Sequence, residues 1–331
     1  MSAGAPLAVL GAGAWGTALA IVIARTGQTV YLWGRNTAHL IEMKTSRENT
    51  RYLAGLTFPP ALIPLPHLGA LPALTRTAVI ATPLQATRAT VRLALANGLD
   101  AFICAAKGIE RDTQQLAHEI VLQEAGSTTA VALISGPNFA REVAEGRPAA
   151  LAVAARDDRF GNALVARLHG PTLRPYRTDD LTGVAVGGAV KNVLAIAAGI
   201  GDGLNLGANS RAALITRGLH EMARFGIALG GRMETFMGLA GLGDLVLTST
   251  DDHSRNRRYG LALGRGVERE IAGELGLVEG IPTAAAVIGR AIAAQIEMPI
   301  CAQVARTISG ECTPLEAVRT LMARELPALM T

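Results

Sequence analysis

The run Pro6-Leu7-Ala8-Val9-Leu10-Gly11-Ala12-Gly13-Ala14-Trp15-Gly16 decides the fold of this chain. Its apolar first half predicts a short buried strand that ends at Leu10, and an apolar helix is predicted from about Thr17 to Arg25. A second strand is predicted at 29–33. The run therefore predicts a strand–turn–helix–strand unit, the setting in which a GxGxxG sequence binds dinucleotides.

The three glycines of this pattern have separate roles in such a unit. Gly11 permits the tight turn, Gly13 lets the backbone approach a pyrophosphate, and Gly16 lets the helix pack closely on the strand. The start of the helix then presents free N–H groups to phosphate oxygens. The alternative is a tight glycine-rich turn without a ligand, but the flanking strands and helix favour a dinucleotide.

The end of the second strand predicts which dinucleotide is preferred. A site selective for NAD usually has Asp or Glu there to bind the ribose 2′-hydroxyl. Here the sequence is Trp33-Gly34-Arg35-Asn36, and no acid follows until Glu42. A positive Arg35 suits a 2′-phosphate, so the sequence predicts a preference for NADP(H), with NAD(H) as the second cofactor. A solvated surface arginine is the alternative.

Composition limits the class of protein. The chain has 331 residues, 50% of them hydrophobic and 18% charged, which excludes a disordered chain. A net charge of +4 suits an anionic ligand but gives no support for nucleic acid. Residues 1–24 carry no charge, yet the glycines interrupt the apolar run and no basic segment precedes it, so neither a signal peptide nor a membrane span is expected.

Cysteine and histidine usage points to a reducing compartment. Cys104, Cys301 and Cys312 are odd in number and form no CxxC pair, and the six histidines form no HExxH. The sequence therefore predicts no disulfide framework and no metal site, and we expect a cytoplasmic protein.

Apolar strand-like runs alternate with helical stretches up to about residue 182. Strands are predicted at 77–81, 101–104, 130–134 and 149–154, helices near 84–96, 113–125 and 158–168, and a mainly extended, proline-rich crossover at 47–75. This alternation predicts a doubly wound, Rossmann-type parallel sheet covered on both faces, with ligands at the carboxyl ends of the strands. Lys107-Gly108 and Ser135–Ala140 fall at such ends.

Helical periodicity replaces the strand signals after residue 182. We therefore predict two domains, a Rossmann-like NAD(P)-binding domain at 1–182 and an all-helical substrate and catalytic domain at 183–331. The stretch Thr313-Pro314-Leu315-Glu316 has the sequence of a capping box with proline at the first helical position.

Lys191 is the most informative residue of the helical domain. It lies in Val184–Gly199, where nearly every other residue is small or apolar. Burying an ammonium is costly unless it is paired or its pKa falls, and a lowered pKa is what a catalytic lysine needs near neutral pH. An edge lysine with its stem buried and its head in water is an equally good interpretation of this segment alone.

Two further segments of this domain are hard to explain as packing. Asp244 is a lone carboxylate among small and apolar residues, and a buried acid needs a partner such as a lysine. The run His253-Ser254-Arg255-Asn256-Arg257-Arg258 concentrates hydrogen-bond donors. A solvated basic turn is the usual explanation of such a run, but next to a dinucleotide fold it favours an anion site.

Several stretches together resemble the bacterial NAD(P)-dependent glycerol-3-phosphate dehydrogenases. In the family's order, they are Gly11–Leu19, Lys107-Gly108, Ser135–Ala140, Gly187–Val193, Gly207–Gly218, Gly238–Leu245, Ser254–Arg258 and Val278–Gly280. The resemblance implies reversible reduction of dihydroxyacetone phosphate to sn-glycerol 3-phosphate with NAD(P)H, for glycerophospholipid synthesis. It also makes a homodimer plausible.

The resemblance also implies roles for individual residues. Lys191 would exchange the proton with the substrate oxygen, Lys107 would hold or polarise the substrate, and Asp244 would balance both charges. The implied substrate-binding residues are Lys107, Gly136, Asn138, Lys191, Asn192, Asp244, Thr248, Ser254, Arg255 and Asn256. The implied cofactor-binding residues are Gly11, Gly13, Ala14, Trp15, Gly16, Arg35, Lys107, Ala140, Arg255, Leu277 and Glu279. Asn138 departs from the family, which usually has Ser or Thr there.

Two other functions compete with this one. A dehydrogenase of the β-hydroxyacid type would share the Rossmann domain, a helical domain and a catalytic lysine, but Ser254–Arg258 favours a phosphorylated substrate. A nucleotide-sensing protein without activity would be expected to lack the two lysines or Asp244, and all three are present.

Overall fold

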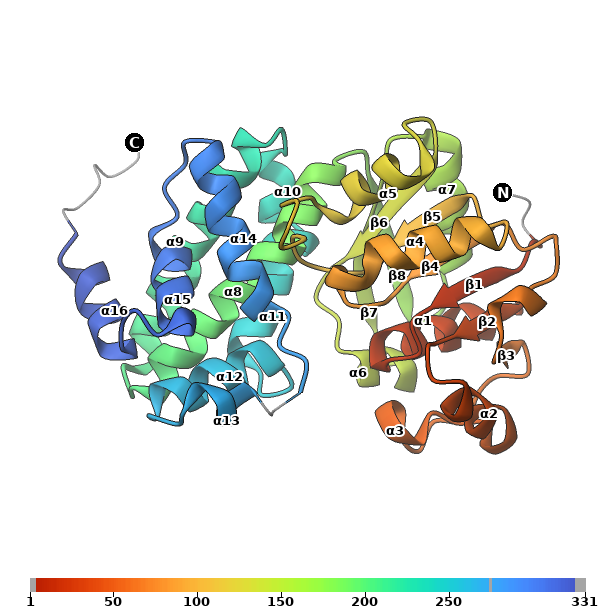
Figure 1. The fold of residues 1–331 in the computed structure, drawn as a ribbon, viewed down its shortest axis with the longest axis horizontal. Helices are drawn as coiled ribbons and strands as arrows, with labels where there is room; N and C mark the ends of the chain where they lie inside the picture. Colours follow the sequence, from red (N-terminus) through yellow and green to blue (C-terminus); the bar gives the residue numbers. More distant parts are fainter. Residues whose placement is uncertain (1–3, 274–275, 325–331) are drawn as a thin grey trace.

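The computed structural model describes residues 4–273 and 276–324, which form a sheet-containing first half and a helical second half (Figure 1). The ends of the two predicted domains, at residues 1–3 and 325–331, lie outside the described residues. Residues 274–275 also lie outside them.

An eight-stranded sheet forms the first half, in the spatial order β3-β2-β1-β4-β5-β6-β7-β8. Its strands are β1 (Leu7–Leu10), β2 (Val30–Trp33), β3 (Leu62–Pro64), β4 (Thr77–Ile80), β5 (Ala101–Cys104), β6 (Ala130–Ser135), β7 (Ala149–Ala155) and β8 (Leu173–Thr178). The central strands β1 and β4 are buried along their whole length, as strands of a parallel sheet covered on both faces should be. The predicted Rossmann-type sheet is confirmed.

One strand pairing differs from the predicted parallel sheet, because β7 runs antiparallel to β6. The connection between these strands holds only a six-residue helix, α6 (Ala140–Glu145). A parallel crossover needs a helix long enough to carry the chain back across the sheet, and this one is too short. The strand β8 then pairs parallel to β7, so the last two strands both run against the rest.

The proline-rich segment 47–75 is less extended than predicted. It contains α3 (Thr50–Leu53), the edge strand β3 and the short 3-10 helix η1 (Leu68–Ala70). Proline disfavours helix only at and just before its own position. The first part of the segment contains no proline and forms one helical turn, capped by the Asn49 side chain.

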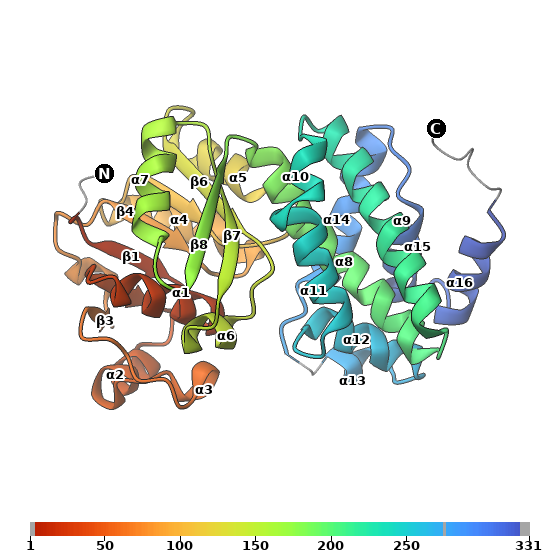
Figure 2. The ribbon, with the colours of Figure 1, turned by 180° about the vertical axis from the view of Figure 1, so that it is seen from behind.

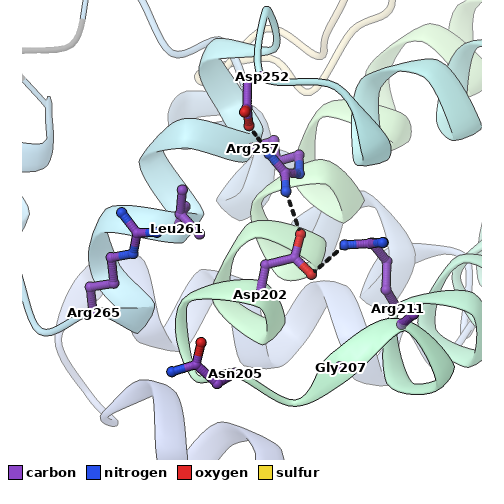
Figure 3. A pocket seen from close by; sticks show the side chains of 9 residues that line it. Asp202, Asn205, Gly207, Arg211, Asp252, Arg257, Leu261 and Arg265 are labelled. Carbon is purple, nitrogen blue, oxygen red and sulfur yellow. Dashed lines mark hydrogen bonds and ion pairs between the residues drawn. The ribbon is translucent and has the colours of Figure 1, made fainter.

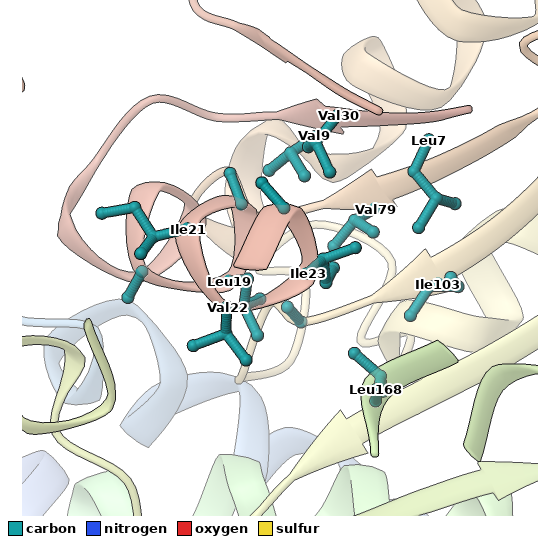
Figure 4. Packing of buried hydrophobic residues seen from close by; sticks show 14 of the residues in the cluster. Leu7, Val9, Leu19, Ile21, Val22, Ile23, Val30, Val79, Ile103 and Leu168 are labelled. Atoms are coloured by element: carbon teal, nitrogen blue, oxygen red, sulfur yellow. The ribbon is translucent and has the colours of Figure 1, made fainter. Parts of the chain in front are cut away.

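Helices cover both faces of the sheet. The helices α4 (Thr87–Ala96) and α5 (Ala117–Ala125) lie on one face (Figure 1), and α1 (Ala14–Arg25) and α7 (Asp158–Leu168) lie on the other (Figure 2). Figure 4 shows the apolar core beneath α1, where Leu19 and Ile23 pack with strand residues such as Val79. The remaining helical elements here are α2 (Thr37–Ser46) and η2 (Leu84–Ala86).

Every secondary-structure element in the described residues of the second half is a helix, which confirms the predicted all-α class. Its elements are α8 (Leu181–Gly203), α9 (Gly207–Ala228), α10 (Met233–Met237), the π-helical turn η3 (Leu239–Gly243), α11 (Asp244–Thr250), α12 (Arg255–Gly264), α13 (Arg269–Gly273), α14 (Gly280–Ala293), α15 (Pro299–Ser309) and α16 (Pro314–Met322). The capping box predicted at Thr313–Glu316 opens α16. The predicted domain boundary at residue 182 falls in the first turn of α8.

Helix α8 is the core of the helical half. It packs against α9, α11, α12, α14 and α15, and nearly all of its residues are buried. Within the described residues it is the single helix long and apolar enough to cross a membrane, and its apolar window is entirely buried inside the protein. Its apolar composition is therefore explained by its place in the core.

Close packing on α8 depends on glycine, and this gives a matched test. A Cβ at Gly199 would lie 2.0 Å from the backbone oxygen of Arg257 on α12, whereas a Cβ at Gly201 would lie 3.9 Å from its nearest neighbour. Gly199→Ala should therefore destabilise the protein by about 1–3 kcal/mol through forced separation of the two helices. Gly201→Ala should be neutral or stabilising by up to about 1 kcal/mol, since alanine is the better helix former.

The measurement is the free energy of unfolding in urea for both variants. Equal values for Gly199→Ala and Gly201→Ala would contradict the packing of α12 on α8 described here.

Candidate active site

Two lysines meet on the two oxygens of one buried carboxylate. The Lys191 Nζ donates to Asp244 Oδ1 at 2.5 Å, and the Lys107 Nζ donates to Asp244 Oδ2 at 2.6 Å. Asp244 is 1% exposed and Lys191 is 7% exposed. The chain contains only three lysines, and the third, Lys44, is exposed on α2. The lysines are therefore concentrated at this point, and the interpretation of Lys191 as an edge lysine with a solvated head is excluded.

Three separate elements bring these groups together. Lys107 follows the carboxyl end of β5, Lys191 lies near the middle of α8, and Asp244 is the first residue of α11. A Cβ at Gly188 would lie 3.3 Å from Ser135 Oγ and 3.4 Å from the side chain of Lys107, so α8 lies directly against the sheet edge. The cluster therefore lies where the two halves of the molecule meet, at the strand ends that bind ligands in such sheets.

Burial and charge set the protonation of this cluster. Burial lowers the pKa of the Lys191 ammonium, Asp244 opposes that shift, and the like charge of Lys107 adds to it, which leaves the pKa at about 8. Burial alone would raise the pKa of the Asp244 carboxyl, but the two neighbouring ammonium groups outweigh it and lower the pKa. Asp244 therefore stays ionised, and Lys191 can gain or lose a proton near neutral pH.

Further polar groups surround the cluster. Thr248 Oγ1 accepts from Lys191 at 2.9 Å, and the backbone oxygen of Gly136 accepts from Lys107 at 3.4 Å. Ser135 Oγ lies 3.5 Å from Asp244 Oδ2. Ser135 is not among the residues predicted for the site. Its place as the last residue of β6, directly before Gly136, is the sequence signal that could have identified it.

A second polar pair adjoins Lys191 along α8. Asn256 Nδ2 donates to Asn192 Oδ1 at 3.0 Å, and Asn256 Oδ1 accepts from the backbone N–H of Gly280 at 2.9 Å. Both side chains are buried, and Asn192 Nδ2 has no hydrogen-bond partner among the described residues. A buried donor without a partner is costly, so Asn192 is suited to bind an oxygen of a ligand.

The predicted anion cluster at 253–258 divides into two groups. Arg255 is exposed, whereas Arg257 is buried and pairs with Asp202 and Asp252. The Ser254 hydroxyl accepts from the backbone N–H of Arg257 at 3.2 Å and caps α12. The expectation that the whole run forms one anion site is therefore too broad, because the Arg257 guanidinium is already paired with two carboxylates.

The predicted cofactor residue Glu279 lies within electrostatic reach of this region. Burial raises the pKa of Glu279, while Arg255 and the two clustered lysines oppose the rise. Leu277, two residues earlier, is exposed. Both residues directly precede α14, whose first residue, Gly280, donates to Asn256.

The GxGxxG turn fits a dinucleotide. A Cβ at Gly11, which has φ of +126°, would lie 2.6 Å from the Ala81 backbone, and a Cβ at Gly16 would lie 1.9 Å from the Gly11 oxygen. A Cβ at Gly13 would meet nothing within 4 Å. Packing therefore explains Gly11 and Gly16 but not Gly13, which caps α1 without a side-chain hydrogen bond. Free space beside unpaired N–H groups is what a pyrophosphate requires.

The other predicted cofactor residues border this turn or the next strand end. Ala14, Trp15 and Ala140 pack against the apolar core around α1. Trp15 Nε1 is a buried donor without a partner among the described residues. Arg35 is exposed directly after β2, and no hydrogen bond or ion pair of Arg35 occurs within the described part of the chain.

Asn138, the departure from the family pattern, is fixed by the sheet. Its Nδ2 donates to the backbone oxygen of Ala150 at 2.9 Å. Its Oδ1 is buried and has no partner among the described residues. The amide therefore offers an acceptor at this position, whereas a serine or threonine hydroxyl could also donate.

Comparison with known proteins assigns the family. The model described as NAD-dependent glycerol-3-phosphate dehydrogenase N-terminus matches residues 6–161, and its C-terminal counterpart matches residues 180–319. This chain belongs to the NAD-dependent glycerol-3-phosphate dehydrogenase family. The resemblance found in the sequence is confirmed.

Individual members of this dehydrogenase family match over nearly the whole chain. The glycerol-3-phosphate dehydrogenase [NAD(P)+] of Thioalkalivibrio sulfidiphilus is 48% identical over 324 residues, 97% of each chain. That of Acidovorax sp. is 49% identical and covers 96% of this chain and 98% of its own. The crystal structure of the glycerol-3-phosphate dehydrogenase of Coxiella burnetii matches with a TM-score of 0.93 and 43% identity, over 97% of this chain and 100% of that chain.

The charge balance at Asp244 gives a testable order of stabilities. Asp244→Asn leaves two ammonium groups facing each other without a carboxylate, and breaking a buried ion pair in this way costs about 3–5 kcal/mol. Lys107→Met keeps the pair between Lys191 and the carboxylate and should cost less. Urea unfolding at pH 7 measures both values.

The control is Asp179→Asn, which removes the carboxylate of an exposed ion pair with Arg232 and should hardly change the unfolding midpoint. An Asp244→Asn protein as stable as this control would contradict the assigned charge balance.

Proposed function

We propose that this chain catalyses the reversible reduction of dihydroxyacetone phosphate to sn-glycerol 3-phosphate with NAD(P)H. Membership of the glycerol-3-phosphate dehydrogenase family supports this substrate and reaction. The observation that carries the proposal is the contact of Lys191 and Lys107 with the two oxygens of Asp244 at the carboxyl end of the sheet. This arrangement holds one titratable ammonium and a second positive charge beside a site for a dinucleotide.

Lys191 is the proton donor and acceptor of the proposed reaction. An ammonium has three N–H donors, and Asp244 and Thr248 accept two of those of Lys191. The third is left for the oxygen at C2 of the substrate. In the reductive direction the ammonium gives its proton to that oxygen, and in the oxidative direction the neutral amine takes it back. A pKa of about 8 keeps both forms populated near neutral pH.

Lys107 and Asp244 support this proton transfer. Lys107 is held by Asp244 and by the oxygen of Gly136, which leaves one N–H to polarise the same carbonyl oxygen. Its positive charge also keeps the pKa of Lys191 low. Asp244 holds both ammonium groups in place and prevents their mutual repulsion from separating them.

The phosphate of the substrate is bound at the start of α12. Arg255 is exposed at the first helical position, and Asn256 is fixed by Asn192 and Gly280. A guanidinium near a helix N-terminus suits a phosphate dianion. Binding the phosphate away from the reacting carbon orients that carbon for the transfer.

The cofactor supplies and accepts the hydride at C2. The turn from Gly11 to Gly16 and the first N–H groups of α1 would hold its pyrophosphate, and Arg35 would meet the adenosine ribose. Trp15, Ala140, Arg255, Leu277 and Glu279 complete the proposed cofactor site. We propose NADP(H) as the preferred cofactor, supported by the positive Arg35 where an NAD-selective site has an acid.

The wider role follows from the same proposal. A glycerol-3-phosphate dehydrogenase of this kind would supply glycerol 3-phosphate for glycerophospholipids. A cytoplasmic location is supported by three free cysteines, two of them buried, in the described part of the chain. A homodimer is proposed from the family resemblance alone.

Removal of the proton donor tests the reaction. Lys191→Ala should lower kcat by a factor of about 10² or more, because the developing alkoxide then lacks its proton source. The measurement is NADPH oxidation with dihydroxyacetone phosphate, beside NADP+ reduction with a panel of β-hydroxyacids to test the competing dehydrogenase class.

The matched control is Lys44→Ala, which removes the exposed lysine of α2 and should leave kcat unchanged. A Lys191→Ala enzyme with near wild-type kcat would remove Lys191 from the proposed role.

Cofactor preference is tested at Arg35. The wild type should have the higher kcat/KM with NADPH, and Arg35→Gln should lower that value about tenfold through loss of a charged phosphate contact while NADH is little affected. Arg159→Gln, which changes an exposed arginine of α7, serves as the control. A wild type that clearly prefers NADH would refute the preference.

A further inference from the structure

Helices α8 and α12 pack side by side in the same direction. Three contacts repeat at the same spacing of 64 residues, namely Asn192–Asn256, Ile196–Gly260 and Ile200–Gly264. A Cβ at Gly260 would lie 2.0 Å from the Ile196 oxygen, and a Cβ at Gly264 would lie 2.4 Å from the Ile200 oxygen. The two backbones therefore touch at Gly260 and Gly264, in the second half of α12.

A chain of ion pairs joins the same two helices at the far end of α8 (Figure 3). Arg257 Nη2 donates to Asp202 Oδ2 at 2.6 Å, and Arg257 Nη1 pairs with Asp252 in the turn before α12. Asp202 Oδ1 also accepts from Arg211 at 2.8 Å. The side chains of Asp202 and Arg257 are each 10% exposed, whereas Asp252 is 81% exposed. The buried pair therefore anchors the exposed turn.

This anchor joins two parts of the proposed active site. Asp202 lies on α8 three turns beyond Lys191, about 16 Å along the helix axis. Arg257 directly follows the phosphate-binding Arg255 and Asn256. One rigid helix thus carries the proton-transferring lysine at one point and the anchor of the phosphate-binding turn at another.

We propose that the Asp202–Arg257 ion pair is a positioning device. It fixes the phosphate-binding turn, which comprises residues 252–256, relative to Lys191. The inference rests on the proposed function and assigns Asp202 and Arg257 no contact with substrate. The pair determines substrate specificity. Only a molecule whose phosphate lies at the correct distance from its reacting oxygen can contact the phosphate-binding turn and Lys191 at the same time. Loosening the pair should weaken phosphate recognition and leave the proton transfer intact.

The test compares dihydroxyacetone phosphate with unphosphorylated dihydroxyacetone, using NADPH for both. Asp202→Asn should lower the ratio of the two kcat/KM values at least about tenfold, equivalent to about 1.4 kcal/mol of phosphate recognition. The value for dihydroxyacetone itself should stay near that of the wild type. A pair that only stabilised the fold would not change this ratio.

Three further variants keep the test sharp. Asp252→Asn changes an exposed carboxylate and should fold normally, so it can be measured even if Asp202→Asn fails to fold. It should lower the ratio of the two kcat/KM values, because it removes the bond between Arg257 and the turn before α12. Adding Asp202→Asn to Arg257→Gln should cause little further loss of the ratio, since Arg257→Gln alone already removes the Asp202–Arg257 pair. Asp158→Asn, which breaks an exposed ion pair with Arg177 in the sheet domain, should leave the ratio unchanged.

The outcomes separate the two proposals. An unchanged ratio in both Asp202→Asn and Asp252→Asn, with a wild type that prefers the phosphorylated substrate, would overturn the positioning role alone. A wild type that oxidises NADPH with neither substrate would overturn the proposed function.

Discussion

Charge compensation around one buried carboxylate is the constraint on which the site depends. Asp244 is almost fully buried, and both of its oxygens are occupied by ammonium groups that come from different halves of the molecule. Neither lysine could be buried there without it, and without the second lysine the pKa of Lys191 would rise. The same contacts therefore hold the sheet domain against α8 and keep Lys191 able to exchange a proton near neutral pH.

The helical half sets the distance between Lys191 and the start of α12. Helix α8 carries Lys191 and Asn192 near its middle, and α12 lies against it with direct backbone contact. Glycines permit that contact. The small residues of α8 therefore do more than fill the core, because they let the backbone of α12 approach closely. In the proposal above, the Asp202–Arg257 pair then holds the turn that precedes α12 relative to Lys191. Under the proposed function, this arrangement would bind the substrate's phosphate and its reacting oxygen at one fixed separation.

The sequence predicted the parts of this protein that depend on local pattern. GxGxxG between apolar strands indicated the nucleotide-binding unit, and Lys191 and Asp244 stood out because each lies in an apolar segment. What escaped prediction depends on contacts between distant segments. Tertiary packing sets the direction of β7, the pairing of Arg257 with Asp202 and the approach of Ser135 to Asp244. The periodicity of a local sequence contains no information on such contacts. The pairing of Arg257 changes the interpretation of the arginine cluster, because a guanidinium whose charge is already balanced by two carboxylates is a weaker partner for an anion.

The most direct measurement of the central claim is the pH dependence of kcat/KM in both reaction directions. The free-enzyme pKa of Lys191, lowered to about 8 by burial and by Lys107, should appear in both profiles. In the proposed mechanism reduction needs the ammonium of Lys191, so kcat/KM for reduction should fall as pH rises through about 8. Oxidation needs the amine, so kcat/KM for oxidation should rise through the same pH. An inflection near the ordinary lysine pKa of about 10.4, or none in either direction, would contradict the account.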